Sequence, residues 1–80
     1  MTASVFSEKY VQFRELLTKY RKDKLITQVD LAERLGKPQS YVSKYESGER
    51  RLDVIEFIEV CEALQIDPNT VINQIRNWGA

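Results

Sequence analysis

The side chains that most often carry out chemistry in proteins are scarce in this sequence. The eighty residues include no histidine and a single cysteine, Cys61. One cysteine cannot form an intramolecular disulfide, and a zinc site needs several Cys, His or carboxylate ligands at fixed spacing. Histidine is also the commonest general acid–base residue of enzymes. The sequence therefore predicts no cofactor, no metal site and no enzyme activity, and the chemistry that remains is binding by polar and charged side chains.

The charged residues balance overall but are unevenly distributed. Lysine and arginine together number 12, as do aspartate and glutamate, so the formal net charge is zero. Residues 19–51 hold nine basic and five acidic residues, whereas residues 52–80 hold only Arg76 against five acidic ones. A chain with a basic and an acidic region can orient on a phosphate backbone without a large net charge. Ordinary solvated surface charge explains the same pattern equally well.

Five short helices are predicted from their start and stop signals. The starts are marked by residues that cap or begin helices, namely Ser7, Thr27, Pro38, Asp53 and Asp67-Pro68. Pro38 is expected at the first helical position, where its missing N–H would be unpaired anyway. Gly36 and Gly48 end the second and third helices, since glycine readily adopts a positive φ. The sequence therefore predicts one all-α domain over residues 1–80, with residues 67–80 as its terminal helix.

The second and third helices have the spacing of a helix-turn-helix unit over residues 28–47. Such a unit joins two short helices by a tight turn that contains glycine. Ala32 lies where the helices cross, so a larger side chain there would push them apart, and Gly36 supplies the turn. The inner faces are filled by Leu31, Leu35, Val42 and Tyr45.

Residues 26–36, Ile-Thr-Gln-Val-Asp-Leu-Ala-Glu-Arg-Leu-Gly, and 38–48, Pro-Gln-Ser-Tyr-Val-Ser-Lys-Tyr-Glu-Ser-Gly, carry a family resemblance. They resemble the phage-repressor-type (Cro/repressor, xenobiotic-response-element) helix-turn-helix family, over about residues 10–66. The resemblance implies a compact five-helix lambda-repressor-like domain that binds double-stranded DNA. It implies a sequence-specific transcriptional regulator, commonly a repressor, that binds a palindromic operator as a homodimer. One departure is Leu25, which stands where many members have a glycine.

The resemblance also implies which residues read DNA bases. In the family, exposed residues at the start of the third helix enter the major groove. The matching residues here are Gln39, Ser40, Ser43 and Lys44. A glutamine amide can pair with adenine, and a lysine can donate to O6 and N7 of guanine. The alternative is that these residues are simply the polar outer face of a surface helix.

Further residues are expected to contact the DNA backbone, namely Thr27, Gln28, Lys37, Tyr41, Ser47, Arg50 and Arg51. Gln28 begins the second helix, where free N–H groups and the helix dipole favour a phosphate, and in the family it also steadies the residue matching Gln39. Tyr41 could instead lie across Pro38 and the turn. Arg50 or Arg51 could probe the minor groove, or could simply be solvated.

Two features are expected to be structural. Arg21 and Glu46 match a family ion pair that ties the first helix to the end of the recognition helix. The terminal helix carries four apolar residues that could form a dimer interface, namely Val71, Ile72, Ile75 and Trp78. The alternative is that they close the core, with Val5 and Phe6 folded over them.

The remaining expectations concern location and a rival function. No apolar run approaches the roughly 20 residues that span a bilayer, and the first residues lack the regions of a secretory signal, so a cytoplasmic protein without a small-molecule effector is expected. The rival is a protein-interaction module, such as an antitoxin-like partner binder, that keeps this fold without specific DNA readout. A phage repressor, a restriction–modification controller and an antitoxin all fit the sequence.

Overall fold

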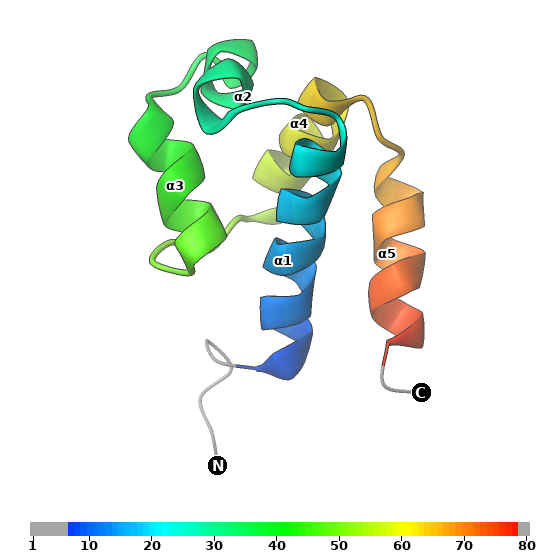
Figure 1. The fold of residues 1–80 in the computed structure, drawn as a ribbon. Coiled ribbons are helices and arrows are strands. Elements are labelled where there is room, and N and C mark those ends of the chain that lie inside the picture. Colours follow the sequence, from blue (N-terminus) through cyan, green and yellow to red (C-terminus); the bar gives the residue numbers. More distant parts are fainter. Residues whose placement is uncertain (1–6, 79–80) are drawn as a thin grey trace.

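The computed structural model describes residues 7–78, and these residues form five helices and no strand (Figure 1). The helices are α1 (Glu8–Asp23), α2 (Gln28–Leu35), α3 (Gln39–Ser47), α4 (Val54–Leu64) and α5 (Pro68–Asn77). The expected all-α fold with five helices is therefore confirmed. Val5 and Phe6 lie outside the described residues. Within residues 7–78, no helix is long and apolar enough to cross a membrane.

Local hydrogen bonds explain where the helices begin. Ser7 caps α1 by accepting a hydrogen bond from the Tyr10 N–H. Reciprocal capping boxes start α2, between Thr27 and Asp30, and α4, between Asp53 and Glu56. The prediction for Pro38 is wrong by one residue. Its extended backbone, with ψ of 157°, makes it the cap that precedes α3, and Gln39 is the first helical residue.

Two helices end at a residue with positive φ that is not glycine. Gly36 ends α2 with φ of +68°, as predicted, but Leu25 follows α1 with φ of +60° and Gln65 follows α4 with φ of +59°. At Leu25 the chain makes both hydrogen bonds of a Schellman motif, Ile26 N to Arg21 O at 3.1 Å and Leu25 N to Lys22 O at 2.9 Å. Leu25 therefore occupies the position that glycine prefers, and its side chain is 89% exposed.

Replacing Leu25 by glycine is expected to stabilise the fold. The left-handed conformation costs a residue with a Cβ about 1–2 kcal/mol, and glycine's larger unfolded-state entropy offsets about 0.5–1 kcal/mol of that relief. We expect a net gain of several tenths of a kcal/mol, measured by urea unfolding. Leu25→Ala is the matched control, because it removes the exposed side chain but keeps the Cβ. An equal gain in both variants would contradict the backbone explanation.

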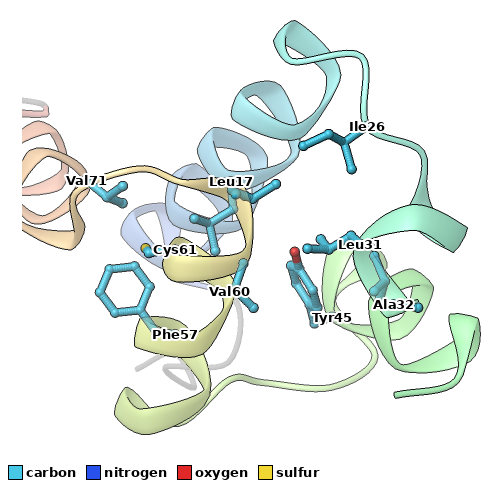
Figure 2. Packing of buried hydrophobic residues seen from close by; sticks show 11 residues of the cluster. Leu17, Ile26, Leu31, Ala32, Tyr45, Phe57, Val60, Cys61 and Val71 are labelled. Carbon is cyan, nitrogen blue, oxygen red and sulfur yellow. The ribbon is translucent and has the colours of Figure 1, made fainter. Parts of the chain in front are cut away.

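The core is built from one face of every helix (Figure 2). Its buried apolar residues are Leu17, Ile26, Leu31, Ala32, Val42, Tyr45, Phe57, Val60, Cys61, Leu64 and Val71. Ala32 on α2 is buried, with 3% of its surface exposed. Its small side chain allows α2 to pack closely on its neighbours α3 and α4. Val42 and Tyr45 are fully buried on α3, and this burial fixes which face of α3 turns outward.

The hydroxyl of Tyr45 is buried without a hydrogen-bond partner among the described residues. Figure 2 shows it pointing into the apolar cluster near Leu31. Burial raises the pKa of this phenol, so the group stays neutral.

A buried polar group without a partner costs about 1–3 kcal/mol. Tyr45→Phe is therefore expected to raise the free energy of unfolding by about 1 kcal/mol. Thermal and urea melts measure this change, and a loss of stability would show that the hydroxyl has a partner in solution.

Candidate nucleic-acid interface

The face of α3 opposite its buried residues carries the four predicted base readers. Gln39, Ser40 and Lys44 are exposed, and Ser43 is half-buried. Ser43 lines a surface hollow together with Gln28, Glu46 and Ser47. In Figure 1, α3 lies at one edge of the molecule, beside α2 and on the side of α1 away from α5. The side chains on the outer face of α3 are thus available to a partner.

A chain of hydrogen bonds runs from the core to the first reader. The buried Arg21 donates from Nε to Oε2 of Glu46 at 2.7 Å and from Nη2 to Oε1 at 2.9 Å. Gln28 donates from Nε2 to the same Oε1 at 2.9 Å. Gln39 in turn donates from Nε2 to Oε1 of Gln28 at 3.3 Å. Four side chains from α1, α2 and α3 are therefore connected.

The carboxylate of Glu46 determines how both amides are oriented. An ionised carboxylate only accepts hydrogen bonds, so Gln28 must turn its NH₂ group toward Glu46. The carbonyl oxygen of Gln28 then faces Gln39, which must turn its own NH₂ group toward Gln28. This leaves the Oε1 and the second N–H of Gln39 for a further partner. An acceptor and a donor side by side are what the edge of adenine requires.

Arg21 and Glu46 form the ion pair that the resemblance implies. Their side chains are only 9% and 7% exposed. Arg21 also donates from Nη1 to the carbonyl oxygen of Ile26 at 2.8 Å, so the guanidinium holds the start of the α1–α2 connection as well. The hydrogen bond to Glu46 raises the pKa of Arg21. The guanidinium therefore stays charged, and its hydrogen bonds to Glu46 fix the end of α3 against α1.

The predicted backbone contacts divide into available and engaged side chains. Lys37 and Ser47 are exposed at the two ends of α3, and the Ser47 hydroxyl donates to the carbonyl oxygen of Lys44 at 3.1 Å. The Lys37 ammonium also lies 5.5 Å from the centre of the half-buried Tyr41 ring. The Thr27 side chain accepts the Asp30 N–H in its capping box, which leaves its O–H to donate. Lys37, Tyr41 and Ser47 lie on or beside α3, whereas Thr27 precedes α2.

The two arginines after α3 are held within the molecule. Arg50 donates to Glu56 through two hydrogen bonds of 2.6 and 3.1 Å, and its guanidinium lies 4.7 Å from the centre of the Tyr41 ring. The hydrogen bonds from Arg50 hold the pKa of Glu56 down to about 2. Arg51 lies 3.8 Å from the centre of the Tyr10 ring. Arg50 is paired with Glu56 but its side chain is 38% exposed, so its phosphate contact stays a prediction.

Residues 17–71 match the helix-turn-helix family. A solved structure titled "XRE-family like protein", from Pseudomonas syringae pv. tomato str. DC3000, is 43% identical, covers 90% of this chain and 88% of its own chain, and superposes with a TM-score of 0.86. The chain belongs to the XRE-type helix-turn-helix family. This is a family of DNA-binding transcription regulators.

Two further structures resemble this XRE-type domain. The restriction–modification controller protein C.AhdI from Aeromonas hydrophila is 29% identical, covers 81% of this chain and 98% of its own, and has a TM-score of 0.73. The clp gene regulator ClgR from C. glutamicum is 24% identical, with coverages of 92% and 96% and a TM-score of 0.79, and it supports the fold alone. A search of curated proteins found no match.

Arg14 lines the same surface hollow as Gln28, Ser43 and Ser47 in this helix-turn-helix domain. It was not among the site residues predicted from the sequence. Its guanidinium donates to the carbonyl oxygen of Glu46 at 3.2 Å, near the end of α3. Gly48 has a φ of +91°, which favours glycine, and a Cβ there would lie 3.0 Å from that guanidinium, so the arginine side chain would have to shift by a few tenths of an ångström. The signal was present: Arg14 precedes Arg21 by two helical turns, and residues at that spacing share a face.

The four apolar residues predicted as a dimer interface are not equally available. Val71 has no exposed surface and packs in the core, so its assignment to a dimer interface is wrong. Ile75 and Trp78 are half-buried, and Ile72 is 43% exposed. In this XRE-type domain α5 therefore serves mainly to cover the core beside α1 and α4.

Proposed function

We propose that this chain is a sequence-specific transcriptional repressor that places α3 in the major groove of double-stranded DNA. The observation that carries the proposal is the oriented amide of Gln39 on the outer face of α3. Since Gln28 occupies one N–H, the remaining N–H and Oε1 match N7 and N6 of adenine. Ser40 lies beside Gln39, and Ser43 and Lys44 lie one helical turn further along α3. These three residues complete the reading surface.

The phosphate contacts of the proposal come from the residues around α3. The N-terminus of α2 offers the backbone N–H of Gln28, which suits a phosphate oxygen, whereas the Thr27 N–H donates to Asp30 in the capping box. Lys37 and Ser47 lie at opposite ends of α3, so together they would fix its depth and tilt. Such contacts position the domain without reading the sequence. Arg50, whose side chain is 38% exposed, joins this set by sharing its guanidinium between Glu56 and a phosphate.

A palindromic operator and a homodimer complete the proposal. One recognition helix reads only a few base pairs, and two-fold symmetry doubles the site. The recognition helices of such a dimer lie about 34 Å apart, one turn of the double helix. The restriction–modification controller protein C.AhdI has this fold and is 29% identical, which supports a regulatory role for this chain.

Selection from random duplex DNA with the purified protein tests the proposal. We expect an enriched site with two inverted half-sites whose centres lie about 10 base pairs apart. The matched control is a variant in which Gln39, Ser40, Ser43 and Lys44 are all alanine, which alters only surface side chains of α3 and should enrich nothing. If the wild type also enriches no sequence, DNA readout is refuted and the partner-binding alternative is favoured.

A further inference from the structure

Tyr41 brings together two cations that come from opposite ends of α3. The Lys37 ammonium lies 5.5 Å from the centre of the Tyr41 ring, and the Arg50 guanidinium lies 4.7 Å from it. Lys37 precedes α3 in the chain and Arg50 follows it. A cation within about 6 Å of the centre of an aromatic ring is attracted by the ring. One side chain of α3 therefore links the segments before and after this helix.

The ring of Tyr41 is attached to the core. Tyr41 is half-buried, and its burial raises the pKa of its hydroxyl, so the side chain stays neutral. Its ring packs edge-to-face on the ring of the fully buried Tyr45, with 6.1 Å between the ring centres. Lysine and arginine side chains are flexible when they stand alone. The Tyr41 ring therefore gives both cations a fixed support.

Tyr41 lies at the edge of the reading face of α3. With 3.6 residues per helical turn, it stands about 60° around the helix from Lys44. On its other side are the buried Val42 and Tyr45. A helix that lies in the major groove turns its central residues to the base edges and its flanks to the phosphate backbone. The two cations on the Tyr41 ring are therefore on a flank that faces phosphates.

The carboxylate of Glu56 limits the charge of this cluster. Two hydrogen bonds from Arg50 hold the pKa of Glu56 at about 2, with smaller contributions from the Asp53 N–H and from the charge of Lys37. Glu56 is therefore ionised at neutral pH and balances one of the two cations. The Arg50 side chain is nevertheless 38% exposed, and Lys37 is exposed as well. The cluster keeps one net positive charge that a phosphate can reach.

We propose that Tyr41 is a positioning residue, whose ring holds Lys37 and Arg50 together so that both bind one phosphate of the DNA backbone. The inference rests on the proposed function and states how two of its backbone contacts are assembled. It assigns Tyr41 to the cations and not to a contact with DNA. Ordering two long side chains before DNA arrives lowers the entropy cost of binding.

Two substitutions at Tyr41 test the inference. Tyr41→Phe keeps an aromatic ring that attracts cations, whereas Tyr41→Leu keeps an apolar side chain without a ring. The measurement is the slope of log affinity against log salt concentration for a duplex that carries one half-site. Tyr41→Phe should keep the wild-type slope, and Tyr41→Leu should lower it by up to about 0.9, the value of one phosphate contact. Circular dichroism checks the fold, and Arg76→Ala on the exposed side of α5 is the control that should keep the slope.

Substitutions of the cations leave the core intact and test whether they share a phosphate. Lys37→Ala and Arg50→Ala should each lower the slope, and the double variant should lower it by no more than about 0.9. A fall of about 1.8 in the double variant would indicate two separate phosphates and overturn the inference. Unchanged slopes in both single variants, or equal slopes in Tyr41→Leu and Tyr41→Phe, would overturn it too.

The same titrations separate this inference from the function on which it rests. Phosphate contacts carry no sequence information, so discrimination by Gln39 should persist in every variant that lacks a cation. If the inference fails while the wild type still prefers its selected half-site, DNA readout stands and only the role of Tyr41 falls. A wild type that binds no duplex refutes the proposed function and the inference together.

Discussion

Replacement of Arg21 by methionine is expected to destabilise the protein by about 3–5 kcal/mol. The reason is that the carboxyl group of Glu46, only 7% exposed, would be left buried without the guanidinium that binds it. The carbonyl oxygen of Ile26 would also lose its donor. Urea unfolding followed by circular dichroism measures the change. A loss of stability below about 1 kcal/mol is typical of an exposed ion pair. Such a result would show that water reaches Arg21 and Glu46 and that this pair does not hold α1 against α3.

A double-mutant cycle separates the pair from its surroundings. Arg21→Met combined with Glu46→Leu removes both charges, and replacing a whole buried ion pair by apolar residues is often close to neutral. We therefore expect the double variant to regain most of the stability that either single variant loses. It should nevertheless bind DNA less selectively, because Gln28 has lost the carboxylate that orients it. Stability and readout would then be separated in one protein.

Replacement of Gln39 by alanine is expected to relax specificity at a single base pair. A bidentate contact between glutamine and adenine discriminates against the wrong base by about 1–3 kcal/mol. The loss should therefore fall on one position of each half-site and leave the others unchanged. Binding to duplexes that carry each substitution in turn measures it. Asn73→Ala, an exposed amide on α5, is the control that should change nothing.

Gln28→Ala extends this prediction to the residue behind the reader. Gln28 holds the amide of Gln39 in one orientation, so its removal should weaken discrimination at the same base pair as Gln39→Ala does. The combined variant should lose little more than either single one at that position, since both act through one contact. Additive losses at two different base pairs would show that the hydrogen-bonded chain does not determine readout.

Helix starts and the helix-turn-helix spacing were predictable because they depend on nearby residues. The Thr27–Asp30 and Asp53–Glu56 capping boxes each join residues three apart, and the sequence alone indicates them. Leu25 shows the limit of such rules. Its sequence position suggested a departure from the family, but only the structure gives it the φ of +60° that glycine would adopt more readily.

The parts of the site that were missed depend on contacts between distant residues. The hydrogen bond from Gln28 to Glu46 joins residues 18 apart, and no local pattern indicates it. The pairing of Arg50 with Glu56 was not predicted from the sequence, where Glu56 serves the start of α4, whereas in the structure Glu56 both caps α4 and binds Arg50. Val71 was expected at a surface because helical periodicity shows that a helix has an apolar face. It does not show whether the core or a partner covers that face.

An NMR titration of the ¹⁵N-labelled protein with its selected duplex is the most direct test of where DNA binds. The side-chain amide signals of Gln28 and Gln39 and the backbone amides from Gln39 to Lys44 should shift most, together with those at the N-terminus of α2. The outer face of α5 should stay unperturbed. If the largest shifts instead map to α5, or if the signals of α3 do not move when the duplex is saturating, the outer face of α3 is not the surface that meets DNA.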